Sequence, residues 1–209
     1  MKKIRVYIYI SILTIVCAAN TCTCGRKSVN PTHYIDQTTR DYLIFLPNSK
    51  WVYQRENTTE TDTNIVTSQN TIFSFSRALG RTSEIHGYSF SSSRTSAPCG
   101  GGGFSISNRG TNERSSCYAF FTNCYQSIVL FFNEPTLGYT SSEGLKYVAQ
   151  YPNYTVQGKD YIDVREFAYT SALEPVSPKR IWYARYVGII KKELANGEVW
   201  NLVEHDVKQ

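Results

Sequence analysis

From Tyr42 onward, hydrophobic and polar residues form short runs that turn residues separate. Most runs alternate with a period of two, which predicts β-strands with one buried face, and two are continuously apolar, as buried strands are. The expected total, about nine to eleven strands, is typical of a sandwich or a barrel. The clearest runs lie at residues 42–46, 51–53, 72–76, 88–91, 117–121, 128–132 and 161–169.

Helical periodicity is weak throughout the chain. No segment keeps a 3.6-residue period over the roughly 10–12 residues typical of a helix. One short helix is predicted at residues 141–150, where a Ser-Glu pair can begin it. Within residues 161–169 the alternation shifts phase at Phe167, which predicts a β-bulge near Arg165-Glu166. The pattern therefore predicts an all-β domain with at most one short helix.

The C-terminal part of the chain carries the strongest hairpin signal. Two apolar runs flank Asn196-Gly197, and this dipeptide favours a two-residue type I′ turn. Such a turn pairs Leu194 with Val199 and Ile190 with Val203. Apolar residues then fall on both faces, so we expect a hairpin that is covered on more than one side.

The N-terminus reads as an export signal. Residues 1–5 are basic, and the next 14 residues are apolar apart from two hydroxyl residues. A membrane-spanning helix needs about 20 residues, so the pattern predicts a signal peptide over residues 1–24. These residues hold three of the five net positive charges, leaving +2 on the other 185 residues. The basic balance is thus a targeting feature and predicts no nucleic-acid partner.

Cys22 and Cys24 lie just past the apolar run and are candidates for a lipidated first residue. A Thr precedes each of them where Gly or Ala is usual, so a soluble secreted protein remains the alternative. Residues 25–41 are polar without periodicity and predict a flexible tether. Residues 42–209 are then the β domain.

Motifs for catalysis or metal binding are missing from the sequence. It has no His-Glu-x-x-His, no paired Cys-x-x-Cys and no Gly-x-Ser-x-Gly. The glycine run at residues 100–103 lacks the Lys that a phosphate-binding loop needs. We therefore expect no catalytic residue, no metal, no cofactor and no enzymatic activity.

Three cysteines lie in the predicted β domain, and an exported protein can pair them as disulfides. Cys99–Cys117 would fix the glycine-rich loop, whereas Cys117–Cys124 would close a strand-to-strand connection. Both pairings leave one thiol over, and both remain open.

Tyrosine is unusually frequent, with 16 residues. Tyr151, Tyr154, Trp182 and Tyr183 could form an aromatic surface that stacks on sugar rings. The alternation of aromatic with polar residues favours instead a core position with the hydroxyl group at the rim.

Two stretches carry a family resemblance. Residues 41–53, with Trp51-Val52-Tyr53, and residues 181–193, with Trp182-Tyr183-Ala184, resemble the opening and closing motifs of secreted lipoproteins common in Bacteroidetes. Tyr186 stands where that family usually has Gly, so a looser turn is expected there. The resemblance implies a single curled antiparallel sheet, half-barrel or barrel-like, similar to the half-barrel lipoprotein carriers. In those carriers a concave apolar face binds acyl chains.

Together these features predict an exported, lipid-anchored protein of the outer membrane or cell surface, or a periplasmic or secreted one if lipid is absent. We expect it to bind an apolar ligand or an envelope protein partner. The alternative is a glycan-binding or surface-adhesion module.

Overall fold

The computed structural model describes residues 32–77, 80–93, 101–107, 116–121, 126–130, 137–138, 140, 144–170, 175 and 177–209. For residues 101–104, 107, 116–121 and 126–130 it describes the backbone alone. One compact unit spans Thr32–Gln209. The predicted signal peptide, the lipidation candidates and the first part of the predicted tether lie outside the described residues.

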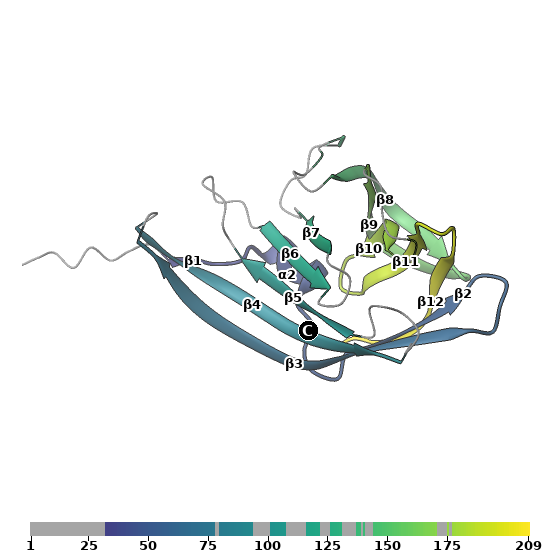
Figure 1. Ribbon diagram of the computed structural model, residues 1–209, viewed down its shortest axis with the longest axis horizontal. Coiled ribbons are helices and arrows are strands. Elements are labelled where there is room, and N and C mark those ends of the chain that lie inside the picture. The colour runs from purple at the N-terminus through teal and green to yellow at the C-terminus, as the bar shows by residue number, and fades with distance from the viewer. Residues whose placement is uncertain are drawn as a thin grey trace, which may run out of the picture. The chain divides into compact units, whose positions relative to one another are not determined.

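The described chain is almost entirely β, as expected (Figure 1). Its elements are β1 Thr32–His33, α2 Gln37–Leu43, β2 Lys50–Arg55, β3 Thr61–Ser76, β4 Arg81–Ser92, β5 Gly101–Ser107, β6 Ser116–Phe121, β7 Gln126–Leu130, β8 Leu145–Val156, β9 Lys159–Tyr169, β10 Pro178–Ala184, β11 Gly188–Leu194 and β12 Val199–Asp206.

The strands form a single curled sheet that is not closed into a barrel. Its order is β7-β6-β5-β4-β3-β2-β12-β11-β10-β9-β8, with neighbours antiparallel. β1 pairs in parallel with β4 and makes the sheet mixed. The predicted strand at residues 42–46 does not form, and the one at residues 128–132 is confirmed as far as Leu130, where the described residues end. The other predicted strands are confirmed.

The helix is not where the sequence predicted it. Most of residues 141–150 that are described belong to β8, and residues 42–46 contain no strand because α2 includes Tyr42 and Leu43. Asp36 caps α2 and accepts hydrogen bonds from the Thr39 amide and hydroxyl at 2.8 and 2.7 Å. Seven residues are too few to display helical periodicity, so tertiary contacts decide this helix.

The predicted tether is also wrong over its described part. Thr32 and His33 form β1, and Ile35, Thr39 and Asp41 are buried. The folded unit therefore begins at Thr32 rather than at residue 42. The hydrophobicity pattern does not reveal this segment, because several of its buried residues are polar. Their hydrogen bonds to one another and to the sheet make that burial possible.

The predicted bulge lies on the partner strand. Tyr147 pairs with Phe167 and Ala149 with Glu166, so the extra residue is Val148 on β8 and not a residue of β9. β9 has its own irregularity at Asp163, whose φ is 48°.

The C-terminal hairpin forms with a different turn. Lys192 pairs with Trp200 and Glu193 with Val199, one residue away from the predicted register. The Leu194 amide donates to the Glu198 carbonyl and the Gly197 amide to the Leu194 carbonyl, which closes a three-residue loop. Of Asn196 and Gly197, only the glycine has a positive φ. This shift gathers the buried side chains on one face: Ile190, Leu194, Trp200 and Leu202.

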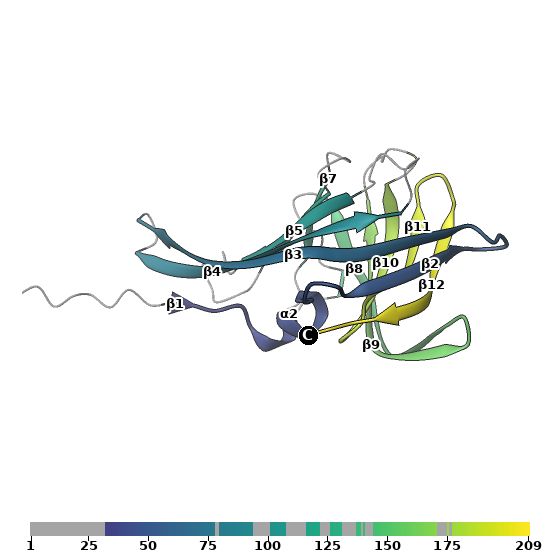
Figure 2. The same ribbon diagram turned by 90° about the horizontal axis from the view of Figure 1, so that it is seen from below.

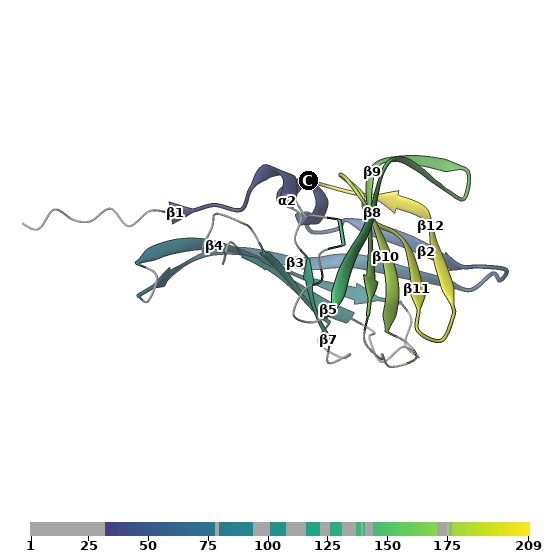
Figure 3. The ribbon, with the colours of Figure 1, turned by 90° about the horizontal axis from the view of Figure 1, so that it is seen from above.

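A two-residue turn with both φ values positive occurs elsewhere, at Gln157-Gly158 between β8 and β9. The tip of this hairpin turns back beside β12 (Figures 2 and 3). There the Lys159 ammonium donates to the Val203 carbonyl at 2.6 Å.

The two stretches that carry the family resemblance pack on each other. The Trp51 indole donates to the Val187 carbonyl at 2.6 Å, and the Tyr53 hydroxyl donates to the Ile189 carbonyl at 2.9 Å. Tyr186 adopts a left-handed φ of 64°, the conformation that Gly adopts more readily. The turn nevertheless keeps its hydrogen bond from the Val187 amide to the Ala184 carbonyl.

Side chains of the chain itself occupy the core face of strands β9–β12. Residues of α2, β10, β11 and β12 belong to one buried cluster. Its fully buried members include Tyr42, Leu43, Ile181, Tyr183, Ile190, Trp200 and Leu202. Within the described residues, no helix is both long and apolar enough to cross a bilayer.

Candidate functional site

The β3–β4 hairpin continues well past the last pairing of β3 with β2 (Figure 1). β2 pairs with β3 only from Thr61 to Ile65, whereas β4 pairs with β3 as far as Ser76. Over residues 67–76, no strand of the described chain pairs with the second side of β3. We call these ten residues the β3 edge. In such an edge, alternate residues turn backbone donors and acceptors away from the sheet.

The β3 edge also exposes large apolar side chains. Ile72, Phe73 and Phe75 are 50%, 57% and 49% exposed. Tyr34, which is 61% exposed, places its ring edge-on to that of Phe73, with centroids 6.2 Å apart. We call these four residues the apolar cluster. Ile72 lies on the opposite face of the strand from Phe73 and Phe75, so both faces of the β3 edge expose large apolar side chains. Exposed apolar side chains of this size make the edge a candidate for a binding surface.

Protective features are scarce along this edge. Residues 67–76 contain no charged residue and no Pro. Native sheets usually protect an exposed edge with Lys, Pro or a bulge. The register shift between Val66 and Ser68 leaves Thr67, the first residue of the β3 edge, as the extra residue, and Ser68 to Ser76 then pair with β4 without interruption. The edge can therefore accept another extended segment by strand addition.

Polar contacts hold the hairpin behind the β3 edge in place. Glu84 of β4 is buried and accepts hydrogen bonds from the Ile35 amide at 2.9 Å and the Arg40 guanidinium at 2.6 Å. Thr71 and His86 join β3 to β4 through a 2.9 Å hydrogen bond between Oγ1 and Nδ1. Burial and the positive charge of Arg40 lower the pKa of His86. The Thr71–His86 hydrogen bond therefore links β3 to β4 near the middle of the β3 edge.

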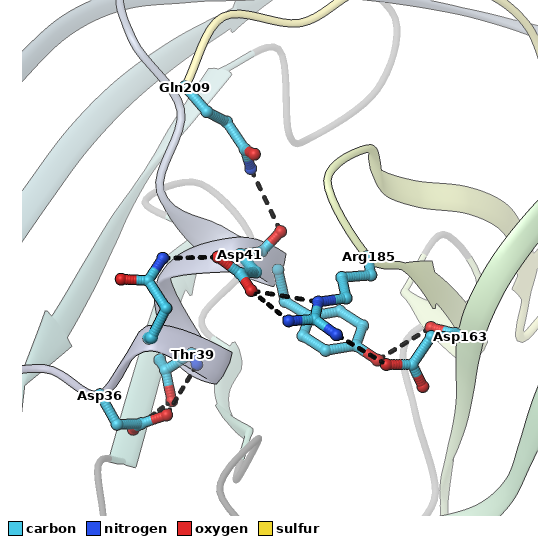
Figure 4. Close-up of polar contacts among 8 residues, drawn as sticks. Asp36, Thr39, Asp41, Asp163, Arg185 and Gln209 are labelled. Carbon is cyan, nitrogen blue, oxygen red and sulfur yellow. Dashed lines mark hydrogen bonds and ion pairs between the residues drawn. The ribbon is translucent and has the colours of Figure 1, made fainter.

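A second polar cluster joins α2 to the end of β10 (Figure 4). Arg185 donates to Asp41 from Nε at 3.1 Å and from an Nη at 2.6 Å. Gln37 donates to the other Asp41 oxygen at 2.6 Å, and Asp163 lies 3.8 Å from the Arg185 guanidinium. The C-terminal Gln209 donates to the Asp41 carbonyl at 3.1 Å. The cluster thus fixes the helix, the C-terminus and two strands to one another.

Charge within this cluster is balanced. Burial raises the pKa of Asp41, but the hydrogen bonds and positive charge of Arg185 and the hydrogen bond from Gln37 outweigh burial and lower it overall. The Tyr42 hydroxyl donates to the Asp163 carbonyl at 2.8 Å, and the Arg165 guanidinium lies 4.6 Å from the centre of the Tyr42 ring. Burial raises the pKa of Tyr42 far above its usual range. Because its charged groups pair with one another, the cluster serves the architecture.

The predicted aromatic surface forms only in part. The ring centroids of Tyr151 and Tyr154 lie 5.0 Å apart. Tyr154 stacks on Trp182, with ring centroids 6.4 Å apart. Tyr183 points to the opposite face and packs on Phe167. Both Trp182 and Tyr183 are buried, so neither offers a ring face to a sugar. The structure therefore favours the core position for these two aromatics.

Acidic and basic groups surround the half-buried tyrosines. The Tyr151 hydroxyl donates to Glu166 at 2.7 Å, which raises the pKa of Tyr151 to about 12. Arg180 lies 3.5 Å from Glu166, and the Lys191 ammonium lies 4.9 Å from the centre of the Trp182 ring. The two oxygens of the buried Glu166 side chain thus contact Tyr151 and Arg180 at the rim of the core.

The structure does not test the predicted disulfides. Cys99 and Cys124 lie outside the described residues. Cys117 is described by its backbone alone, in β6, where it pairs with Ile106 and Leu130. Within the described chain, no group of three or more His, Cys, Asp or Glu side chains is placed to hold a metal ion.

Sequence reasoning found the strand of the β3 edge but missed its exposure. Alternation at residues 72–76 predicts one buried face, whereas the structure exposes both faces. The available signal was the uncharged run from Thr67 to Ser76, which is unusual for a solvated strand.

Comparison with known proteins does not assign the chain to a family. No protein-family model matches the chain, and no curated protein matches it significantly.

Proposed function

We propose that this chain is an exported, lipid-anchored envelope protein without enzymatic activity, and that it binds a partner protein through the β3 edge. The observation that carries the proposal is the ten-residue uncharged edge with Ile72, Phe73 and Phe75 exposed beside it. Strand addition supplies main-chain hydrogen bonds, and side-chain contacts on each face supply specificity.

A partner protein fits the observations better than an acyl chain does. The core face of strands β9–β12 is occupied by the chain's own aromatic and aliphatic residues. An acyl chain needs a concave apolar site. The exposed apolar residues instead lie along a strand edge, where the unpaired backbone also requires hydrogen-bond partners.

The anchoring part of the proposal rests on residues 1–24. The basic start, the apolar run and the cysteines after it support export with a lipid on Cys22 or Cys24. Intact mass of the protein from its own envelope tests this directly. A mass increase of two or three acyl chains on a chain beginning at either cysteine supports the anchor, and an unmodified mature chain contradicts it.

Photo-crosslinking in the native envelope tests the binding part. A photoreactive amino acid at Ile72 should give a discrete crosslinked product. The matched control is Ile162, which is 58% exposed on β9, away from the β3 edge. Absence of a product at Ile72, or equal products at both positions, would contradict binding at the edge.

A further inference from the structure

The β3 edge has the properties of a strand that can pair with itself. Thr67 to Ser76 carries no charge, so two copies can approach without bringing like charges together. The run also holds two Thr, two Phe and one Ile, residue types that favour extended backbone. A second copy of the edge is itself an uncharged, β-prone segment of the same length, so the two edges are compatible along their whole run.

Charge at the end of the strand selects the orientation. Arg77 follows the edge directly and is exposed. A parallel arrangement of two copies would place the two Arg77 side chains at the same end. An antiparallel arrangement over ten residues separates them by about 33 Å, several times the Debye length of about 8 Å.

From these observations we infer that the partner is a second copy of this chain, whose β3 edge pairs antiparallel with the first about a two-fold axis. The inference rests on the proposed function, because it names the occupant of the same edge. Two-fold pairing uses the same surface on both copies and is the commonest symmetry of soluble oligomers.

Pairing near the middle of the edge accounts for the apolar cluster. Ile72 points to one face and Phe73 and Phe75 to the other, as alternation along a strand requires. An antiparallel pair centred near Ile72 and Phe73 brings the apolar side chains of the two copies together on both faces. The outward backbone groups gain partners at the same time, and the two sheets become one continuous sheet.

Sedimentation of the mature protein purified from its own envelope, with the detergent contribution subtracted, tests the inference. We expect a species of twice the chain mass. The double variant I72K/F73K should dissociate, with a dimer dissociation constant raised at least about tenfold, because Lys on an edge opposes strand addition. I162K should remain dimeric, since Ile162 is equally exposed on another strand.

A second double variant distinguishes loss of the dimer from damage to the fold of the monomer. N70K/S74K adds two charges at exposed polar positions of the edge and removes no apolar contact. It should also dissociate, with an unchanged melting temperature of the monomer. A dimer that survives both double variants overturns the inference.

The crosslinked product from Ile72 separates the two claims. A product of twice the chain mass supports the second copy. A product with a different protein, together with a monomer in sedimentation, overturns the second copy while leaving binding at the edge intact. Absence of any product overturns both.

Discussion

The Asp41 carboxylate accepts two hydrogen bonds from the Arg185 guanidinium, although 144 residues separate the two in sequence. Asp41 belongs to α2, and Arg185 follows β10 directly. The same residue also accepts through its backbone carbonyl from the Tyr186 amide at 2.7 Å. This residue pair therefore docks the N-terminal segment on the sheet, and the rest of the cluster forms around it.

Asp41→Asn should destabilise the domain. Arg185 would keep its charge and lose the nearer of its two carboxylate partners, so we expect the free energy of unfolding to fall by about 1–3 kcal/mol. The lower part of that range is favoured because the Arg185 side chain is 35% exposed and solvent screens the pair. Urea unfolding measures the loss, and Asp206→Asn at an exposed position is the control. Equal stabilities of the two variants would contradict a docking role.

The same pair predicts an acid-sensitive stability. The pKa of Asp41 is lower in the folded state than its unfolded value of about 3.9. Its contribution is therefore complete above the unfolded pKa and is lost as the pH falls through the lower, folded pKa. Unfolding of the wild type and Asp41→Asn at a series of pH values should show a difference that is constant near neutrality and shrinks below about pH 4. A difference independent of pH down to 2 would refute this.

Two glycines with nearly the same backbone conformation should respond differently to alanine. Gly188 and Gly197 have φ values of +91° and +88°. A Cβ at position 188 would lie 3.0 Å from the Phe45 ring, whereas a Cβ at position 197 meets nothing within 4 Å. We expect Gly197→Ala to cost about 1–2 kcal/mol through conformation alone, and Gly188→Ala to cost at least about 1 kcal/mol more. Thermal unfolding of both variants checks this, and equal losses would show that the Phe45 ring moves aside freely.

Gln157→Asn should stabilise the β8–β9 hairpin. Gln157 has a φ of 50° in a two-residue turn where Asn is strongly preferred at the first position. Asn tolerates the left-handed conformation better, so we expect a gain of about 0.5–1 kcal/mol. Gln157→Ala removes the same side chain without that tolerance and should give no gain. A melting temperature that is unchanged or lower in Gln157→Asn would count against the assigned turn.

Short-range patterns predicted most strands but not their detailed pairing. Asn196-Gly197 marked the correct hairpin, yet a three-residue loop forms there, and one residue of shift moves Trp200 and Leu202 to the face of Ile190. Turn geometry of this kind depends on how the buried faces meet, which a single strand pattern does not contain.

The N-terminal segment and the site depend on long-range contacts. α2 forms because Asp36 caps it and Asp41 meets Arg185, and neither contact appears as a hydrophobic period. The β3 edge is exposed because β2 begins at Lys50, opposite Ile65, and so does not extend along residues 67–76. The sequence of residues 67–76 contains no information about where β2 begins. Their lack of charge was the only local sign.

Amide hydrogen exchange along the β3 edge tests the central claim most directly. Exchange over residues 67–76 is compared between the protein in its native envelope and the purified chain diluted well below micromolar concentration. We predict slower exchange of the outward-facing amides in the envelope, with no change at the exposed β8–β9 turn around Gln157. Identical exchange of the β3 edge in the two samples would contradict the claim that this edge binds a protein.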